Sequence, residues 1–575
     1  MTNGEEKKVN TSSSTASSAS LSGLSPLKHS LFRAIWLAVI ASNIGSMMEA
    51  VGEAWLMTSL VASSLIVALT WASDSLSIVA LALPAGALAD IVDRRLLLII
   101  SQSWMFAVAL ILGVITLAGL ITPINLLVLI FLLGLGEAIS TPAFSPFLLG
   151  TVPRIETRNA ITLNSVALNI GRGVGPAAGG LLVAAAGPAA VFLLNAISFA
   201  GIIVVLFRAR RKRNSSAVDQ HREAAALAAS SPPSAPPLPS PQQQLPAERM
   251  FSAMRVGLRY VQNSRQIHFV FARVIVFAIF VSALPALLPT LSRHVLGLNA
   301  TGYGLLFTLF GVGAIVGGII IVPRAMNKAS ASPDKLIVVA TILFAISLVV
   351  LGTVQNLIVL GAAMTVAGIS QLMSFSSFSF ALYRNLPNWV MSRVASVYQL
   401  VLQAAIVGGS VLWGLVADKV GIENALLLAG ILLPIGLAAK IKLPLMSGTK
   451  VVDVTPSKHY PSPLLPYEPE LDQGPVLVQI EYKIDPARQE DFAAAMNQLS
   501  IIRKRDGAFF WGLFRHDKYA DVYIEAFLID SWAEHLRQHE RITVADRAVE
   551  DHAFSFHIGE KPPIVSHFIA EPLKG

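Results

Sequence analysis

The chain has 575 residues, of which 54% are hydrophobic and only 14% are charged, and its mean hydropathy is +0.64. Soluble domains carry about 25% charged residues, so this composition excludes an ordinary soluble enzyme and favours a membrane protein. The chain has no cysteine, which excludes disulfides, thiolate metal sites and cysteine nucleophiles. What the net charge of +8 indicates depends on where in the chain the charged residues lie.

Residues 1–25 are rich in Ser and Thr and are expected to be disordered. After them come long apolar blocks of about the 20 residues that cross a bilayer as a helix. Residues 26–207 hold six, at about Leu31–Leu56, Leu65–Leu88, Leu96–Leu120, Ile124–Leu148, Ile161–Ala185 and Ala189–Phe207. Residues 266–445 hold six more, at about His268–Thr290, Gly302–Val322, Leu336–Val354, Leu357–Leu382, Val394–Ala417 and Ala425–Ile441. The first block is too long for a cleavable signal peptide, so we expect it to remain as a helix.

A cytoplasmic linker, residues 208–265, separates the two sets. It contains the Pro-rich run Ser230–Pro246 and then a stretch with apolar and basic residues at helical spacing. We expect that stretch to form a helix on the surface of the inner leaflet. Two six-helix halves joined by a long linker are the layout of two-lobed secondary transporters.

Orientation follows from Lys and Arg in the short loops, which favour the cytoplasmic side. One side would hold nine, namely Arg94, Arg95, Arg154, Arg158, Arg324, Lys328, Lys335, Arg384 and Arg393. The other side would hold only Arg293 and Lys419. We therefore expect the first side and both termini in the cytoplasm of a bacterium, with the protein in its inner membrane. The basic run Arg208–Arg213 then acts as a topology signal, and no nucleic-acid partner is expected.

A second Pro-rich linker, residues 446–474, leads to a segment with short alternating apolar runs, residues 475–575. Its pattern predicts strand, helix, strand, strand, helix, strand, which is the split βαβ, ferredoxin-like order. Such a sheet has one bare apolar face, so we expect dimerisation through this C-terminal domain. The predicted fold class is therefore an all-α polytopic membrane protein of twelve transmembrane helices plus a C-terminal α+β ferredoxin-like domain.

The stretch GALADIVDRR, Gly86 to Arg95, joins the second and third spans. It resembles the loop motif of the major facilitator superfamily, with matches at Gly86, Asp90, Arg94 and Arg95 and departures at Ile91 and Asp93. The resemblance implies that these residues latch the outward-open state. The alternative is a simple loop salt bridge together with topology charges.

Longer stretches narrow this resemblance to one branch of bacterial exporters. LNSVALNIGRGVGPAAGG, GLRYVQNS, VYQLVLQAAIVGGSVLWG and SWAEHLRQHERITVADRA resemble the transmembrane secretion effectors, a group that includes siderophore exporters of the enterobactin type. Long members of that group carry a C-terminal domain similar to antibiotic-biosynthesis monooxygenases. The resemblance implies an exporter and says little about its substrate.

Five charged residues lie well inside the predicted spans, and all five are in the N-terminal half: Glu49, Glu53, Asp74, Glu137 and Arg172. An ionisable group in hydrocarbon is costly unless it faces a cavity or a partner. We predict that Glu49, Asp74, Glu137 and Arg172, with the polar Asn169, bind protons or substrate. The alternatives are a buried Arg172–carboxylate pair that only holds helices together, an outer-vestibule charge for Glu53, and an interhelical hydrogen bond for Asn169.

The resemblance to facilitator exporters supports acidic groups on the first and fourth helices, as at Glu49 and Glu137. The fourth helix lacks the early Arg of the usual proton-coupling motif, so proton coupling is an expectation. Arg33, Arg273 and Lys440 lie near span ends, where their side chains can reach the interface.

His535 and His539 are four residues apart on a predicted helix, but no third ligand lies at a recognisable spacing, so no metal and no cofactor are expected. The leading hypothesis is proton-coupled export of a small amphiphilic molecule, such as a drug, siderophore or other secondary metabolite, by alternating access. The alternative is a membrane-anchored enzyme whose C-terminal domain oxidises an aromatic compound. Expected partners are the small-molecule substrate, protons and the lipid bilayer.

Overall fold

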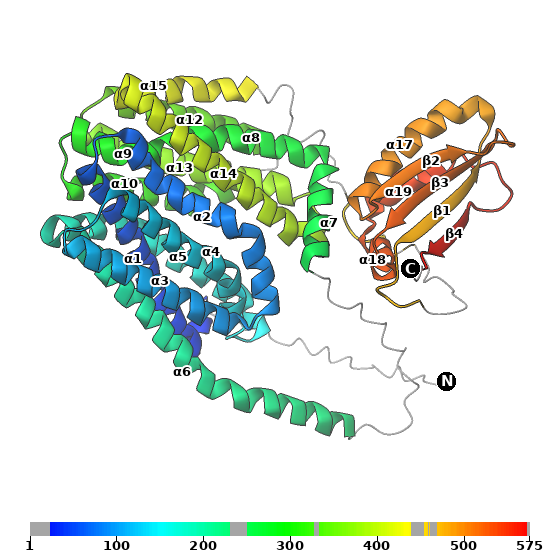
Figure 1. The fold of residues 1–575 in the computed structure, drawn as a ribbon, viewed down its shortest axis with the longest axis horizontal. Coiled ribbons are helices and arrows are strands. Elements are labelled where there is room, and N and C mark those ends of the chain that lie inside the picture. The colour runs from blue at the N-terminus through cyan, green and yellow to red at the C-terminus, as the bar shows by residue number, and fades with distance from the viewer. Residues whose placement is uncertain are drawn as a thin grey trace, which may run out of the picture.

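The computed structural model of the chain describes residues 23–229, 250–326, 333–438, 453–457, 459 and 469–571. A bundle of long helices fills one side of Figure 1, and a smaller domain with a sheet lies beside it. The predicted disordered tail, up to residue 22, lies outside the described residues. So do the Pro-rich run of the first linker and most of the second linker.

The N-terminal half has six long helices. These are α1 (Ser30–Leu60), α2 (Ser64–Ile91), α3 (Arg94–Leu117), α4 (Pro123–Leu149), α5 (Thr157–Ala186) and α6 (Pro188–Ala229). Short 3-10 turns, Ser25–Lys28 and Arg154–Glu156, precede α1 and α5. The helices begin at polar caps where the sequence supplies them. The Asp93 side chain, for example, accepts hydrogen bonds from the backbone N–H groups of Arg95 and Leu96 at the start of α3.

The C-terminal half is more interrupted. Its first span combines α8 (Arg265–Val281), α9 (Ala283–Thr290) and the π-helical turn η3 (Leu291–Val295). The second combines α10 (Ala300–Val316), the π-helical turn η4 (Gly317–Ile321) and α11 (Val322–Met326). The rest are α12 (Pro333–Thr353), α13 (Leu357–Tyr383), α14 (Asn388–Val420), α15 (Ile422–Leu432) and the 3-10 turn η5 (Leu433–Ala438).

Eleven helices of the described chain are long and apolar enough to cross a membrane. The segment at the predicted twelfth span is the shorter apolar stretch Ile422–Gly436, and residues 439–441 lie outside the described residues. The protein is thus a mostly helical, multi-pass membrane protein, and the count of twelve remains a prediction.

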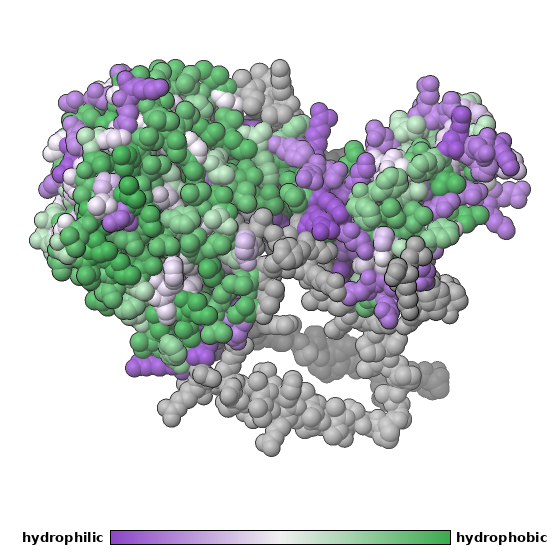
Figure 2. All heavy atoms as spheres, viewed as in Figure 1, coloured by the Kyte–Doolittle hydropathy of each residue, from purple (hydrophilic) through white to green (hydrophobic). Residues whose placement is uncertain are grey.

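The outer surface of the bundle is apolar, as the broad green area in Figure 2 shows. Large side chains such as Leu117, Ile124 and Ile358 are 72%, 72% and 84% exposed. In water such a surface would be unfavourable, whereas lipid chains cover it at no such cost. The surface therefore matches a bilayer as its solvent.

Each half also has an apolar interior. In the C-terminal half, Phe277 packs against Phe344, Phe375 and Phe378 with ring centroids 5.7–6.2 Å apart. Two apolar clusters fill the N-terminal half, one around Phe32 and Phe147 and one around Phe192 and Phe199.

The C-terminal domain contains a four-stranded antiparallel sheet of order β2-β3-β1-β4. Its elements are β1 (Val476–Lys483), a 3-10 turn (Pro486–Arg488), α17 (Gln489–Arg505), β2 (Phe510–Arg515), β3 (Val522–Ile529), α18 (Trp532–Arg541), α19 (Val544–Phe554) and β4 (Ile564–Ile569). Val476, Val478, Ile480 and Tyr482 of β1 are buried, and the residues between them are more exposed. This period of two places the core on one face of the sheet.

The bundle has two ends, which we name from the C-terminal domain. The domain-proximal end carries the α13–α14 turn, Arg384–Pro387, which lies against the C-terminal domain together with α7 (Met250–Gln262). The domain-distal end carries the α1–α2 turn, Val61–Ser63, and the end of α14 at Val420.

Candidate functional site

Glu49 lies inside the N-terminal half, where α1 packs against α6. The side-chain amide of Asn195 on α6 donates a hydrogen bond to its Oε2. Only 5% of Glu49 is exposed, and its other oxygen, Oε1, has no hydrogen-bond partner. A buried carboxylate that is only half satisfied is costly, so it marks a place where a proton or a cation would be stabilised.

Asp74 and Glu137 lie at a close contact between α2 and α4. A Cβ added to Gly134 would meet Ser77 and the Asp74 carbonyl, and the Ser77 hydroxyl donates to the Phe131 carbonyl at 2.7 Å. Glu137 follows Gly134 by about one turn. Within the described residues, neither carboxylate has a hydrogen bond or an ion pair.

Glu137 faces the interior of the bundle. It follows Val128 by nine residues, which is half a turn around an α-helix with 3.6 residues per turn. Val128 is 51% exposed on the apolar outer surface, so Glu137 lies on the opposite side of α4, where it is still exposed.

The four carboxylates form one group. Glu49, Glu53, Asp74 and Glu137 are close enough for their charges to interact through the protein interior. The structure thus brings together three residues of the predicted site and adds Glu53, for which an outer-vestibule charge was the alternative.

Arg172 does not form the pair with a carboxylate that was the alternative for it. Among the described residues no ion pair involves Arg172. Asn169, three residues before it, donates from Nδ2 to the Ser165 carbonyl of its own helix at 2.8 Å. Neither Arg172 nor Asn169 therefore makes an ion pair or a side-chain hydrogen bond to another helix among the described residues.

On the face of α5 that carries Arg172, the side chains are exposed before Arg172 and buried after it. Ile161, Ser165 and Leu168 precede Arg172 on this face and are exposed, whereas Pro176, Gly179 and Val183 follow it and are buried. The outer face is the opposite one, because Leu181, half a turn away, is 58% exposed. The interior face is thus accessible from the domain-proximal end and covered towards the distal end.

Contacts at the distal end join the two halves. The Asp418 carboxylate on α14 accepts hydrogen bonds from the Ser63 hydroxyl (2.7 Å) and from the backbone N–H groups of Ser64 (2.6 Å) and Leu65 (3.4 Å) at the start of α2. A Cβ at Gly180 of α5 would clash with the Ala300 carbonyl of α10, so these helices also touch closely there.

Aromatic residues reinforce this closure. Trp55 of α1 stacks on Tyr303 of α10 with centroids 6.1 Å apart, and the Arg293 guanidinium lies 5.2 Å from the Trp55 ring. Arg293 also donates to the Thr58 hydroxyl at 3.4 Å. The conformation is closed at the distal end.

The predicted latch residues lie at the domain-proximal end. Arg95 donates to the carbonyls of Leu206 (2.8 Å) and Phe207 (3.3 Å) on α6, so it ties α3 to its own half. A Cβ at Gly86 would meet nothing within 4 Å, so close packing does not require glycine there in this conformation. Asp90 lies in α2, but its side chain is outside the described structure; Arg94 starts α3 and is exposed.

Arg273, expected to reach the interface, is instead buried. Its guanidinium pairs with Asp334 at the start of α12, and only 5% of Arg273 is exposed. The expectation failed because Asp334 begins the neighbouring helix at the same depth, which one helix's sequence does not reveal.

The C-terminal domain is docked onto α7 and α14. Arg259 of α7 donates to the Gly507 carbonyl at 2.9 Å and lies 3.5 Å from the Asp530 carboxylate. The Arg541 guanidinium lies 4.5 Å from the Trp389 ring of α14. The basic face of α7, predicted to lie on lipid headgroups, therefore contacts the C-terminal domain.

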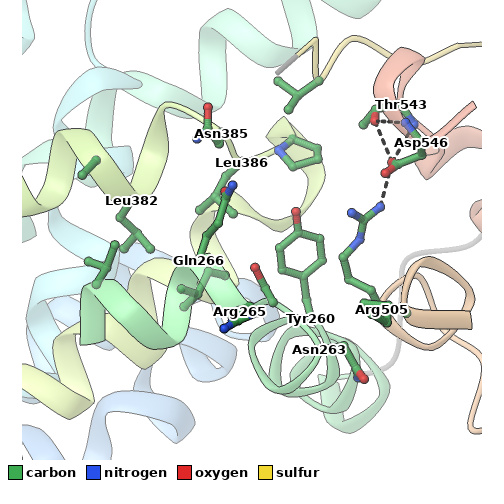
Figure 3. A pocket seen from close by; sticks show the side chains of 17 residues that line it. Tyr260, Asn263, Arg265, Gln266, Leu382, Asn385, Leu386, Arg505, Thr543 and Asp546 are labelled. Carbon is green, nitrogen blue, oxygen red and sulfur yellow. Dashed lines mark hydrogen bonds and ion pairs between the residues drawn. The ribbon is translucent and has the colours of Figure 1, made fainter. Parts of the chain in front are cut away.

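A cavity of about 250 Å³ lies at this junction (Figure 3). Its walls come from α7, the start of α8, the end of α13, the α13–α14 turn and the C-terminal domain. The sequence analysis did not find it, because its walls come from segments far apart in the chain. The lining residues drawn with labels are Tyr260, Asn263, Arg265, Gln266, Leu382, Asn385, Leu386, Arg505, Thr543 and Asp546.

Within the C-terminal domain, buried charges are paired. Arg503 contacts Glu525 at 3.1 Å and Glu550 at 2.7 Å. The Tyr482 hydroxyl donates to Glu525 at 3.0 Å, and burial raises the pKa of Tyr482, so it stays a neutral donor. The network links helix and sheet.

Three histidines gather beside Trp532. The His535 ring lies 4.5 Å from the His539 ring and 4.7 Å from the His567 ring. Burial lowers the pKa of His535 to about 2 and that of His539 to about 4. Across the described residues, no group of three or more His, Asp or Glu side chains is arranged to hold a metal ion.

Comparison with known proteins shows the family to which the chain belongs. The family described as "Transmembrane secretion effector" matches residues 21–231 and 237–573. The staphyloferrin A transporter of Staphylococcus aureus (strain NCTC 8325 / PS 47) is 22% identical over 353 residues, which are 60% of this chain and 79% of that protein.

Solved structures share the fold. A bacterial homologue of the human lysosomal transporter Spinster, inward-facing and unoccupied, superposes with a TM-score of 0.53 at 14% identity, covering 73% of this chain and 97% of its own. The nucleoside transporter NupG gives a TM-score of 0.54 at 12% identity, covering 72% and 100%. At these identities the likeness concerns the fold alone.

Proposed function

The chain belongs to the transmembrane secretion effector family of the major facilitator superfamily, and from this membership we propose that it exports a small amphiphilic molecule by alternating access. The transported molecule would be a drug, a siderophore or another secondary metabolite. The family is one of membrane transporters, which supports transport over an aromatic-oxidising enzyme.

The observation that carries this proposal is the group Glu49, Asp74 and Glu137. These carboxylates lie in apolar helices close to one another, and Glu49 keeps one unpartnered oxygen. Each can take up a proton where the interior is open on one side and release it after the bundle reopens on the other. Arg172 and Asn169 lie on the accessible face of α5, where they would contact the substrate.

In this proposal the domain-proximal end faces the cytoplasm, as do both termini, and the membrane is a bacterial inner membrane. The excess of Lys and Arg in the loops at that end supports this orientation. The conformation described above would then be open to the cytoplasm. Gly86, Asp90, Arg94 and Arg95 would act in the opposite, outward-open conformation as a latch.

We also propose that residues 475–575 form a ferredoxin-like domain, related to antibiotic-biosynthesis monooxygenases, that serves assembly. The strand order β2-β3-β1-β4 supports this topology. The sheet face away from the helices carries Phe510, Phe514 and Phe568, which are 43%, 50% and 53% exposed. Pairing this face with that of a second copy would remove apolar surface from water, which supports dimerisation.

The test uses the full-length protein in proteoliposomes with an imposed pH gradient. A panel of amphiphiles is first screened for altered toxicity in a strain that lacks the gene, and a hit is then followed as uphill transport. We expect the combined variant Asp74→Asn and Glu137→Gln to lose at least ten-fold in gradient-driven accumulation, because two proton sites are removed.

Glu423→Gln is the matched control, since Glu423 is an exposed carboxylate at the start of α15. It should leave accumulation unchanged. Unchanged gradient-driven accumulation in the double variant would contradict the proposal that Asp74 and Glu137 carry the coupled protons.

A further inference from the structure

The junction cavity between the membrane bundle and the C-terminal domain is polar on one side and apolar on the other. Ile267, Leu382 and Leu386 supply apolar walls, and the polar lining gathers around Tyr260 and the start of α8. At about 250 Å³ the cavity is close to the lower limit of ligand pockets, about 300 Å³. Its size therefore suits a small molecule.

Tyr260 directs its hydroxyl into this cavity. In Figure 3 its ring stands between Arg505 on one side and Gln266 and Leu386 on the other. Only 4% of the residue is exposed, and within the described structure its hydroxyl makes no hydrogen bond. Burial raises the pKa of Tyr260, so the hydroxyl remains protonated and offers a hydrogen-bond donor.

The start of α8 supplies more donors at the same place. The helix begins at Arg265, and the side chain of its N-cap residue, Ser264, caps no backbone group. The first backbone N–H groups of a helix lack partners within the helix and carry its positive end. Arg265, Gln266 and Ile267 all line the cavity, and the Arg265 guanidinium, 5.3 Å from the Phe269 ring of the same helix, places a positive charge beside it.

The acidic residue in the wall is already paired through one of its oxygens, Oδ2. Asp546 accepts hydrogen bonds from the Thr543 hydroxyl (2.6 Å), the Thr543 backbone N–H (3.1 Å) and Arg505 (2.7 Å). Arg505 makes its bond to Asp546 from Nη2, and it donates from Nε and Nη2 to the carboxylate of Asp506. What the cavity still offers to an anion is the Tyr260 hydroxyl, the first backbone N–H groups of α8 and the charge of Arg265, which forms no ion pair among the described residues.

We propose that this junction cavity binds the anionic group of a small amphiphile, with the anion at the start of α8 against Tyr260 and Arg265 and the apolar part on Ile267, Leu382 and Leu386. Ile501 and Thr543 of the C-terminal domain line the same cavity, so a ligand that fills it links this domain to the C-terminal half. This site is separate from the carboxylate group of the N-terminal half. Its binding does not depend on the direction or the coupling of transport.

The same anion could come from a dissolved organic acid or from a lipid headgroup, and the experiment separates these sources. Full-length protein is placed in nanodiscs of phosphatidylcholine alone or with phosphatidylglycerol, and benzoate binding is measured by calorimetry. Benzamide, which is uncharged and has nearly the same shape, serves as the ligand control.

We expect benzoate to bind in phosphatidylcholine and benzamide to bind at least ten-fold more weakly. Equal benzoate affinity in both lipids identifies a dissolved acid, and competition by phosphatidylglycerol identifies a headgroup. Tyr260→Phe should weaken binding about five-fold, the size of one hydrogen bond. Arg265→Gln should weaken it at least ten-fold.

Two variants away from the cavity match these changes. Tyr519→Phe removes an exposed hydroxyl of the C-terminal domain, and Arg255→Gln removes a charge of α7 that faces Asp530. Both should bind benzoate as the parent does. The proposal is overturned if benzoate does not bind, if benzamide binds equally well, or if Tyr260→Phe and Arg265→Gln, with unchanged melting temperatures, bind as the parent does.

Discussion

The two halves of the bundle differ in how the charges in their interiors are partnered. The N-terminal half holds Glu49, Asp74 and Glu137, with neither an ion pair nor, for Asp74 and Glu137, a hydrogen bond among the described residues. The C-terminal half holds Arg273 and Asp334, which pair directly at the start of α12. An unpaired charge in an apolar interior costs free energy and supports a functional hypothesis, whereas a paired charge is more easily explained by structure.

In the C-terminal domain, as in the C-terminal half to which it is docked, buried charges are paired. Arg503 is buried and paired with Glu525 and Glu550, and Arg541 is buried and paired with Glu534. The histidines beside Trp532 remain neutral because burial lowers their pKa values, so they bury no charge. The difference supports the proposal that protons are exchanged in the N-terminal half.

The largest expected effect comes from breaking the pair of the C-terminal half. Arg273→Met leaves Asp334 buried without its partner, which should cost about 3–5 kcal/mol of stability. The measurement is the unfolding temperature of the purified protein in detergent. Glu49→Gln, which removes charge from the N-terminal half, should leave that temperature unchanged or raise it.

The double variant Arg273→Met with Asp334→Leu separates the pair from the packing around it. It should recover most of the lost stability, because neither charge remains buried alone. Equal destabilisation by Glu49→Gln and Arg273→Met would contradict the contrast between the halves.

Much of the bundle could be predicted from the sequence, because lipid requires long apolar helices and these are visible as uninterrupted blocks. The prediction weakened where a span was short or broken. α15 ends at Leu432, and the first span of the C-terminal half is three consecutive segments. Helix breaks of this kind depend on neighbouring helices that satisfy the backbone, which one segment's hydropathy does not report.

Acidity should destabilise the C-terminal domain through its histidines. Burial holds the pKa of His535 at about 2 and that of His539 at about 4, below the value of about 6.5 of an unfolded chain. The neutral rings therefore contribute their full stability above pH 6.5, and this stability falls as the pH drops. At pH 5 the loss should be about 2 kcal/mol per histidine.

Hydrogen exchange of residues 475–571 in the full-length protein, at pH 7.5 and pH 5, measures this loss. His535→Phe should reduce the pH dependence by about half, since one of two buried rings is gone. His516→Gln, at a partly exposed position, should leave the dependence unchanged. A pH-independent domain would show that the histidines have the same pKa values in the folded and the unfolded chain.

The candidate site was predicted residue by residue but not as an arrangement. Glu49, Asp74 and Glu137 stood out because a charge in an apolar span is conspicuous, whereas the partner Asn195 looked like any polar residue. The junction cavity could not be predicted at all, because Tyr260 and Arg505 are 245 positions apart in the chain. A local sequence pattern shows that a charged residue lies in an apolar span. It does not show which distant residues lie next to it in the folded protein.

The smallest expected effect concerns the distal contact between the halves. Asp418→Asn keeps the shape of the side chain but weakens its hydrogen bonds to the start of α2, by about 1–2 kcal/mol. Because these bonds exist only while the distal end is closed, the variant should populate the distal-open conformation about ten-fold more.

The chain has no cysteine, so one introduced thiol reports the opening without background. Thr301→Cys places it at the seam, where Thr301 lies 3.5 Å from the Gly180 carbonyl. Asp418→Asn should accelerate its labelling by a membrane-impermeant maleimide about ten-fold, and Asp93→Ala, which uncaps α3 within one half, should not. Equal labelling rates in the two variants would mean that the α5–α10 packing alone holds the distal end closed. The two halves would then differ in how their charges are partnered, and Asp418 would not contribute to the closure.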